Sequence, residues 1–546
     1  MWYNVVMFVK PTKSKNFTYA QLVESYRDEE GKNRHRVIFN LGRVEDNPSL
    51  LRIGQRLVEL ACGKKVCSIE DLEGEEILGW GHVIYKKLWQ EYELDRILGH
   101  ISERKTKIAY DLPNTVFRMV VQHLLDPCSK LKTYSKQQEY VGLEEVELNH
   151  LYRALDVLQQ YKEEIEKEMF YKNRTLFNME VDVVYYDVTT FYFESTKSDE
   201  ELKEFGYSKD GKFNRVQVVM GLFVDTEGRP VGYELFKGNV FDSKTLKKSL
   251  ETLAERFSIR KVVIVADRGM NSKENLKMIK DKGYGYVFAS KLRSMPKQVI
   301  EQVLDQEGYT QINNEEGSFR YKVLEYDNKL KKGKDSLEER LIVTYSDKRA
   351  RKDAADRQRM LDKVSKLLAQ PSKIDASNKR GGKKYLKQIN ADNARWVLDK
   401  DAIEKSSRLD GYYAIQTSEK KIDPRTILAK HHDLWKIEES FRIMKSNLEV
   451  RPMFHWTPRR IKGHFVVCFL AFLLQRELEF RMRKKGIHTS TQEIQRAINS
   501  LKMMKFSHGG QSYYMKAKSL PLASKILSLM KITQPKKVTP QEELSL

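Results

Sequence analysis

The sequence predicts a mixed α/β protein of several domains, built on a sheet whose strands alternate with helices. Three observations lead to this prediction. The chain has 546 residues, which is too long for one compact core. Long helical patterns fill residues 76–175. From about residue 178, short runs of β-branched and aromatic residues alternate with helical patterns, as in an α/β sheet.

Changes in pattern along the chain divide it into six expected segments. They are a small mixed α/β unit at 1–75, a helical domain at 76–175, the first part of the α/β core at 176–290, a β-rich insertion domain at 291–405, the second part of the core at 406–485, and a C-terminal helical segment with a disordered tail at 486–546.

The first unit is predicted to contain a β-hairpin. Two β-rich arms flank the turn DEEG at 28–31. The second arm is basic, with Lys32, Arg34, Arg36 and Arg43. These side chains could face phosphate groups or form a solvated strand edge, and the sequence leaves both interpretations open.

The core begins with three strand patterns, in VDVVYYDVTTFYFE, RVQVVMGLFV and GRPVGYELFKGN. A helix with Leu246, Leu250, Leu253 and Phe257 on one face follows, and then the strand KVVIVAD. A helix closed by Gly283 and the strand GYVFASK complete this part. Three antiparallel strands, a helix and a strand that returns beside the first form the order of a ribonuclease H-like sheet.

The later segments are expected to be more varied. Strand-like pieces (YKVLEY, RLIVTYS) and a charged helix at about 348–368 predict the β-rich insertion. The strand LDGYYAIQTS then leads into helices. The apolar run at 465–474 is too short to span a bilayer, so we expect a buried core helix. The final QPKKVTPQEELSL is typical of a disordered tail.

The charge of the chain favours a polyanionic partner. Lys and Arg number 98 against 76 Asp and Glu, a formal net charge of +22. An excess of this size is typical of nucleic-acid binding that weakens as salt rises. A solvated basic surface without such a partner is the less favoured interpretation.

The four cysteines, Cys62, Cys67, Cys128 and Cys468, are too sparse for a disulfide framework. Cys62 and Cys67 lack a second Cys or His pair at zinc-ligand spacing, so we expect no zinc site there. The start of the chain, MWYNVVMFVK, lacks the apolar stretch of a secretory signal. We therefore expect reduced thiols in a cytoplasmic protein.

Three acidic residues are candidates for a metal site. Asp187 and Asp267 each follow a short apolar strand pattern, and Glu438 lies on an amphipathic helix. The predicted topology places the strands of the two aspartates side by side. Together the three carboxylates could bind a pair of Mg²⁺ ions through oxygen, as enzymes of phosphoryl transfer do. Each Asp could instead cap a turn, and this alternative stays open.

Glu438 is chosen over Glu439 because of the phase of its helix. The apolar stripe of this helix consists of Leu434, Ile437, Phe441, Met444 and Leu448. Glu439 should lie opposite this stripe in solvent, and Glu438 on its flank beside a cleft. Arg442 and Lys445 should project from the side of Glu438. An i,i+4 surface pair of Glu438 with Arg442 is the alternative.

Several segments together resemble bacterial insertion-sequence transposases of the DDE type that have a strand-rich insertion. They are YYDVTT, VADRGM, WKIEESFRIMK, GYSKDGKFNRVQVVMGL, GRPVGYELFKGN and LDGYYAIQTS. The N-terminal hairpin and MVVQHLLDPCSK resemble the family less specifically.

The resemblance implies a ribonuclease H-like catalytic core with Asp187, Asp267 and Glu438 as ligands of two Mg²⁺ or Mn²⁺ ions. Related enzymes have a Tyr seven residues and an Arg four residues before the Glu, and a Lys seven residues after it. Lys445 matches the last position, whereas His431 and Leu434 occupy the first two. Processing of the cut end as a hairpin therefore stays open.

The expected function is that of a DNA transposase. It would bind the terminal inverted repeats of its element, cleave the ends by metal-dependent hydrolysis and join the 3′ ends to target DNA. The helical domain at 76–175 would bind DNA, Arg268, Arg442 and Lys445 would contact it, and a homodimer would pair two ends. A ribonuclease H-like nuclease or resolvase without strand transfer, and an inactive DNA-binding protein, are the alternatives.

Overall fold

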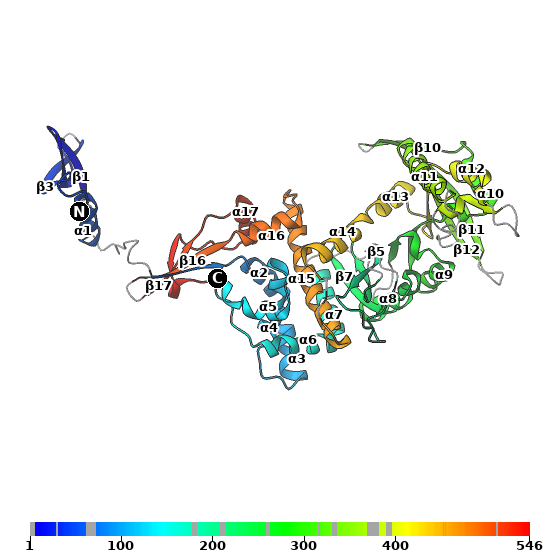
Figure 1. Ribbon diagram of the computed structural model, residues 1–546, viewed down its shortest axis with the longest axis horizontal. Coiled ribbons are helices and arrows are strands. Elements are labelled where there is room, and N and C mark those ends of the chain that lie inside the picture. The colour runs from blue at the N-terminus through cyan, green and yellow to red at the C-terminus, as the bar shows by residue number, and fades with distance from the viewer. Residues whose placement is uncertain are drawn as a thin grey trace. The chain divides into compact units, whose positions relative to one another are not determined.

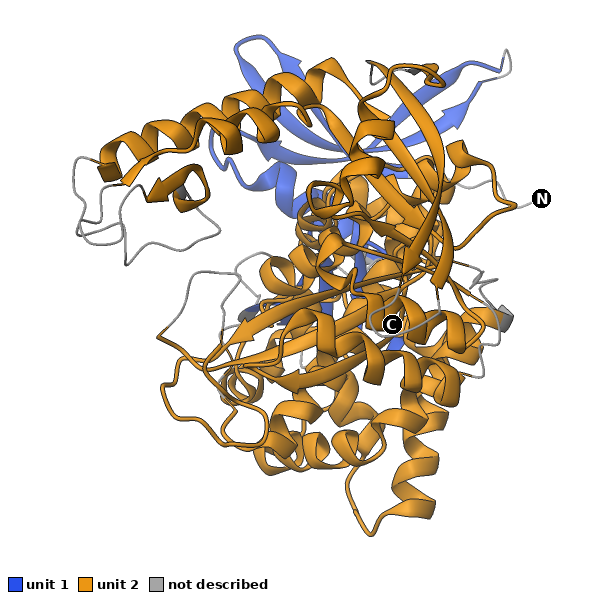
Figure 2. Cartoon of the chain, turned by 90° about the vertical axis from the view of Figure 1, so that its right-hand side faces the viewer, with its two compact units in different colours: residues 1–78, 502–517, 534–546 blue, residues 79–501, 518–533 orange. Residues whose placement is uncertain are grey.

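The computed structural model describes residues 6–28, 31–61, 73–176, 183–206, 214–257, 262–314, 317–329, 336–368, 382–388, 396–450, 453, 455–508 and 511–546. Cys62 and Cys67 lie outside these ranges. The chain forms two compact units, which are coloured separately in Figure 2. Unit 1 consists of residues 1–78, 502–517 and 534–546, and unit 2 of residues 79–501 and 518–533.

Unit 1 contains the predicted hairpin. Strands β2 (Phe17–Arg27) and β3 (Asn33–Arg43) pair antiparallel across the DEEG turn, and an additional strand, β1 (Val6–Ser14), pairs with β2. The helix α1 (Leu50–Ala61) follows. On the basic arm, Arg34 forms an ion pair with Asp28 and Arg36 with Glu24. Both arginines keep most of their side-chain surface in solvent.

A second sheet of unit 1 corrects the prediction for the end of the chain. Its strand order is β18 (Val538–Pro540), β17 (Gln511–Lys516), β16 (Lys502–His508) and β4 (Glu73–Gly79). The predicted disordered tail is wrong for this segment, because Tyr514 of β17 pairs with Thr539, which is buried. The expected C-terminal helical segment is helical only in part, since β16 and β17 form a hairpin in which Met503, Phe506 and Tyr514 are buried.

Unit 2 begins with the predicted helical region, which packs around one long buried helix (Figure 1). Its helices are α2 (Val83–Glu91), α3 (Leu94–Lys105), α4 (Leu112–Leu125), α5 (Lys130–Ser135), α6 (Leu148–Gln160) and α7 (Lys162–Leu176). The long helix α15 (Pro458–Lys484) packs against α4 and α6. Residues 465–474 of α15 are all buried, as predicted. Among the described residues, no helix has the length and apolar character needed to cross a membrane.

The core of unit 2 is a nine-stranded mixed sheet with the order β10-β11-β12-β15-β9-β8-β5-β6-β7. Its strands are β5 (Val183–Tyr192), β6 (Gln217–Val224), β7 (Pro230–Lys237), β8 (Val263–Ala266), β9 (Gly285–Ala289), β10 (Thr310–Asn314), β11 (Gly317–Lys329), β12 (Ser336–Tyr345) and β15 (Tyr412–Thr417). β5 runs antiparallel to β6 and parallel to β8, and β8 runs parallel to β9. The predicted adjacency of the first and fourth core strands is thus confirmed.

Of the strands in the expected insertion, β10, β11 and β12 do not form a sheet of their own. β12 pairs with β15, and β15 pairs with β9, so β10, β11 and β12 extend the core sheet. Ile342 opposite Ile415 is one of the pairs that join the two regions. Around these strands lie α10 (Lys297–Leu304), α11 (Asp347–Leu368), α12 (Lys400–Ser407) and the short pair β13 (Leu386–Gln388) and β14 (Trp396–Leu398).

Helices cover the core strands. The predicted face of α8 (Asp242–Phe257) is buried with residues of β5, β8 and β9 in one apolar cluster. α9 (Lys273–Asp281) joins this cluster and ends before Gly283, whose φ is 75°. α13 (Pro424–His432) packs against β8 and β9, and α14 (Trp435–Arg442) against β5 and β6. A single π-helical turn, η7 (Ile443–Asn447), continues α14.

Candidate active site

Asp187 and Asp267 lie side by side in the register of the sheet. Tyr186 of β5 is the partner of Ala266, the last residue of β8, and the two aspartates directly follow this pair. Because the two strands are parallel, residues at matching positions project to the same face of the sheet. The predicted adjacency of the two strands is confirmed, and each Asp directly follows the last pair of the register.

The face of Asp187 follows from its neighbours. Tyr186 points toward α8, since its hydroxyl donates to Thr245 at 2.8 Å. Successive side chains of a strand alternate, so Asp187 points to the opposite face, where α14 packs. Phe191 shares this face and packs edge-on against Phe465 of α15, with ring centroids 5.3 Å apart. Asp187 is half-buried there.

Asp267 is exposed at the end of β8. Its Oδ1 accepts a hydrogen bond from the backbone N–H of Arg268, which makes it the N-cap of the 3-10 helix η3 (Arg268–Met270). The capping interpretation therefore holds for Asp267. It does not compete with a chemical role, because a carboxylate has further acceptor positions on its second oxygen.

An aromatic pair lies close to Asp267. The hydroxyl of Tyr413 on β15 and Nε2 of His431 on α13 are 3.4 Å apart. Burial lowers the pKa of His431 to about 4, although the negative charge of Asp267 raises it. Burial raises the pKa of Tyr413 to about 12, and Asp267 adds to this shift. Both groups are thus uncharged beside the Asp267 carboxylate at neutral pH.

A cleft of about 1520 Å³ opens at Asp267. Four basic residues line it, namely Arg268, Lys291, Arg293 and Arg349. The guanidinium of Arg349 lies over the ring of Tyr413, 4.5 Å from its centroid. Sequence reasoning identified Arg268 alone, because Lys291 and Arg293 follow β9 and Arg349 lies on α11, outside the acidic motifs.

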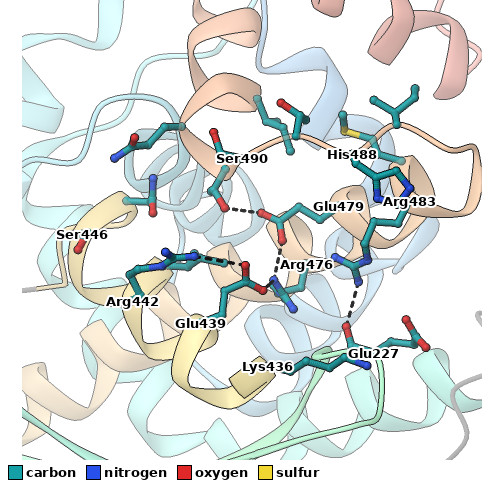
Figure 3. Close-up of a pocket in the computed structure, with 18 of the residues that line it drawn as sticks. Glu227, Lys436, Glu439, Arg442, Ser446, Arg476, Glu479, Arg483, His488 and Ser490 are labelled. Atoms are coloured by element: carbon teal, nitrogen blue, oxygen red, sulfur yellow. Dashed lines mark hydrogen bonds and ion pairs between the residues drawn. The ribbon is translucent and has the colours of Figure 1, made fainter. Parts of the chain in front are cut away.

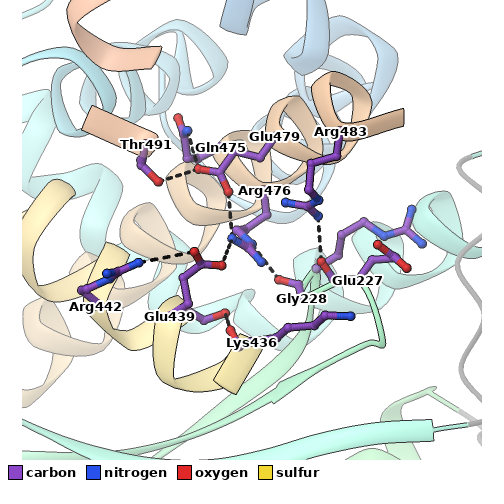
Figure 4. A network of polar contacts seen from close by, with 12 residues as sticks. Glu227, Gly228, Lys436, Glu439, Arg442, Gln475, Arg476, Glu479, Arg483 and Thr491 are labelled. Atoms are coloured by element: carbon purple, nitrogen blue, oxygen red, sulfur yellow. Dashed lines mark hydrogen bonds and ion pairs between the residues drawn. The ribbon is translucent and has the colours of Figure 1, made fainter. Parts of the chain in front are cut away.

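Glu438 is exposed on α14, and the surroundings of Glu439 differ from the prediction. Glu438 is exposed, and within the described part of the chain it forms no hydrogen bond or ion pair. Glu439 is not free in solvent, and its side chain is 26% exposed. Figure 4 shows its carboxylate between Arg442 and Arg476. The prediction that Glu439 lies in solvent is wrong, because α15 covers the side of α14 opposite the apolar stripe. The buried Arg476 of α15 pairs with Glu439 there.

Arg476 is the centre of this polar network. Its Nη1 is 3.1 Å from Glu439 and 2.8 Å from Glu479, and its Nε donates to the carbonyl of Gly228 at 2.9 Å. Its side chain is 2% exposed. The network therefore anchors α14 to α15 and to the turn between β6 and β7.

Arg442 and Lys445 lie in different surroundings. Arg442 is 3.4 Å from Glu439, not paired with Glu438, and lines a pocket of about 550 Å³ beside Arg476 and Glu479 (Figure 3). The expectation that it shares the side of Glu438 is wrong, because the ion pair turns it toward Glu439. Lys445 lies in the π-helical turn, with Nζ 5.7 Å from the ring centroid of Phe191 on β5. Lys445 is thus next to the strand of Asp187.

The three predicted ligands are of the right chemical type but are not gathered tightly. Within the residues that the structure describes, three potential ligand side chains with donor atoms all within 4.8 Å of one another occur at His123, His464 and Cys468, and not at the acidic residues. Unshielded carboxylates repel one another, so an oxygen site for divalent ions is expected to close when the ions bind. Asp187, Asp267 and Glu438 fit such ions as oxygen donors.

The chain was compared with known proteins. The model of the Transposase DDE domain matches residues 178–474, and that of the IS1634 family transposase, N-terminal domain, matches residues 9–65. No curated protein is significantly similar in sequence.

Two of the similar solved structures are transposase complexes. A structure of piggyBac transposase in a synaptic complex with hairpin DNA is 7% identical, with a TM-score of 0.36 over 78% of this chain and 80% of that chain. A Mos1 transposase paired-end complex with left transposon end is 10% identical, with a TM-score of 0.15 over 43% of this chain and 71% of that chain. Both likenesses are weak, whereas the first family model covers more than half of the sequence. The chain therefore belongs to the insertion-sequence DDE transposases.

Proposed function

We propose that this transposase binds the terminal inverted repeats of its element, cleaves the DNA ends by metal-dependent hydrolysis and joins the 3′ ends to target DNA. The observation that carries this proposal is the parallel pairing of β5 with β8, whose last pair directly precedes Asp187 and Asp267. The strand order β7-β6-β5-β8-β9 supports a ribonuclease H-like core. α14, the helix that contains Glu438, packs against β5, which supports Glu438 as the third carboxylate.

Asp187, Asp267 and Glu438 would hold two Mg²⁺ or Mn²⁺ ions, which are the ions that carboxylate oxygens prefer. When bound, such ions supply an activated nucleophile and stabilise the leaving oxygen of a phosphodiester. The protein's own contribution is to fix the carboxylates on a rigid sheet and a packed helix. His431 and Tyr413, whose shifted pKa values leave both uncharged at neutral pH, bring no positive charge to Asp267.

The basic cleft beside Asp267 supports DNA as the partner. Arg268 would contact a phosphate at the mouth of the active site, and Lys291, Arg293 and Arg349 would follow the strand away from it. Lys445 would contact a phosphate near Asp187. Arg442 faces a separate pocket and would contact DNA only after its ion pair with Glu439 opens. We expect a homodimer, because two ends must be cut together.

Cleavage of labelled DNA that contains the element end, with Mg²⁺, tests the proposal. Wild type should cut and Asp187→Asn should bind the same DNA without cutting. Pre-cleaved ends test strand transfer separately. Cutting without joining would favour a nuclease or resolvase, and binding without cutting under any divalent ion would favour an inactive DNA-binding protein.

A further inference from the structure

A cluster of potential metal ligands that contains none of the three acidic candidates lies inside unit 2. His123 on α4 and His464 and Cys468 on α15 have donor atoms within 4.8 Å of one another. All three side chains are buried, with exposures of 3%, 6% and 0%. The function proposed above does not use them.

Hydrogen bonds orient these donors toward one another. Nδ1 of His123 is 3.2 Å from the carbonyl oxygen of Leu448. A carbonyl oxygen can only accept, so Nδ1 bears the proton and Nε2 presents its lone pair. A histidine that donates one ring N–H to a carbonyl and offers the other nitrogen is the usual form of a metal ligand.

The two donors of α15 are four residues apart and thus share one helical face. His464 Nε2 and Cys468 Sγ are 3.5 Å apart. Nδ1 of His464 is buried and has no hydrogen-bond partner among the described residues. Two imidazole nitrogens and one sulfur form a donor set that suits Zn²⁺ and related transition metals, and not Mg²⁺.

A lysine competes for this position. Nζ of Lys130, the first residue of α5, is 3.4 Å from Nε2 of His123, and its residue is 3% exposed. Within the described residues no carboxylate forms an ion pair with it. The lone pair of His123 therefore already faces a positively charged group, and a metal ion and the lysine cannot use it together.

Room for rearrangement adjoins the cluster. A cavity of about 120 Å³ is lined by His123, Cys128, Lys130, His455 and His464, among others. The rings of His455 and His464 have centroids 4.8 Å apart. The Lys130 side chain could move into this cavity when a metal ion binds. His455 or a water molecule in the cavity could then be the fourth ligand.

We propose that His123, His464 and Cys468 bind a transition-metal ion, with Zn²⁺ the best match, in competition with Lys130. Binding releases the thiol proton of Cys468 to solvent, because the thiolate is the ligand. The ion would join α4 to α15 and, through the His123 hydrogen bond, to Leu448 at the end of the helix that contains Glu438. This site is separate from the proposed Mg²⁺ site.

Titration of the full chain with Co²⁺ tests the proposal. The protein is stripped with a chelator and held in excess Mg²⁺, in a background where Cys62 and Cys67 are serine. Wild type should bind one Co²⁺ with a thiolate-to-metal charge-transfer band, and Zn²⁺ should displace it. Cys468→Ser should lose the band, whereas Cys128→Ser, a matched change at the cavity wall, should keep it.

The variant Lys130→Met separates binding at this site from unspecific binding of Co²⁺, because unspecific binding would not depend on Lys130. Removing the competitor should tighten Co²⁺ binding by about tenfold. A misfolded variant would not gain affinity, so this result does not depend on the fold of the Cys468 variant. The absence of a thiolate band in wild type, its persistence in Cys468→Ser, or unchanged affinity in Lys130→Met would each overturn the proposal.

Discussion

Glu438→Gln and Glu439→Gln, two isosteric changes at adjacent positions of α14, are expected to have opposite effects on cleavage and on folding. Glu438 is exposed and forms no hydrogen bond or ion pair within the described residues. Its change should therefore alter the free energy of unfolding by less than about 0.5 kcal/mol. DNA cleavage should be lost, since the third carboxylate of the proposed site is gone.

The magnitude at Glu439 follows from Arg476. Removing one partner of a buried ion pair costs about 3–5 kcal/mol when the remaining charge is left unpaired. Arg476 keeps its contact with Glu479 at 2.8 Å and with the Gly228 carbonyl at 2.9 Å. Glu439 is also partly exposed, at 26%. We therefore expect Glu439→Gln to lower the free energy of unfolding by about 1–2 kcal/mol.

The assay combines urea unfolding with cleavage of labelled element-end DNA at a temperature where both variants are folded. Glu438→Gln should match wild type in unfolding and fail to cut. Glu439→Gln should unfold at lower urea and still cut. If Glu439→Gln were the inactive variant and Glu438→Gln cut normally, the assignment of the third ligand would be wrong.

Three further predictions concern packing, pH and metal. Gly463→Ala should destabilise unit 2 by more than about 2 kcal/mol, because the new Cβ would lie 2.0 Å from the backbone oxygen of Leu155. The control Gly99→Ala, whose new Cβ would have no atom within 4 Å, should be neutral or stabilising in thermal unfolding. Burial lowers the pKa of His82 to about 3, so its neutral form stabilises the fold above pH 6.5 and this contribution falls as the pH approaches 3. Wild type should therefore lose about 3 kcal/mol of stability through His82 between pH 6.5 and 4, and urea midpoints of His82→Gln should lack that part of the loss. A chelator should abolish cleavage and leave end binding in a gel-shift assay nearly intact, and added Mg²⁺ should restore cutting; loss of binding with the metal would contradict this.

The core strands could be predicted because local pattern and topology agree there. The runs around Asp187 and Asp267 are short and apolar, and a strand that returns beside the first is the usual solution for such a chain. The strand-to-loop position of Asp267 was likewise visible in its sequence. What each carboxylate does chemically stays a proposal.

The parts that sequence could not predict depend on partners far away in the chain. Arg476 is one of several charged residues in the C-terminal half of α15, and nothing local indicates that it faces Glu439. β12 pairs with β15 from a distant part of the chain. The periodicity of each segment predicts a strand, but it does not indicate the partner strand. Likewise β18 has only three residues, and its place is decided by the edge of β17.

The second sheet of unit 1, which contains β4, has a consequence for biosynthesis. β4 is made early, yet its sheet contains β16, β17 and β18 from the end of the chain. During translation the hydrogen-bonding edge of β4 therefore has no native partner until almost the whole protein has left the ribosome. A prematurely terminated chain exposes that edge to aggregation and proteolysis. Only chains that extend through β18 can thus complete this sheet.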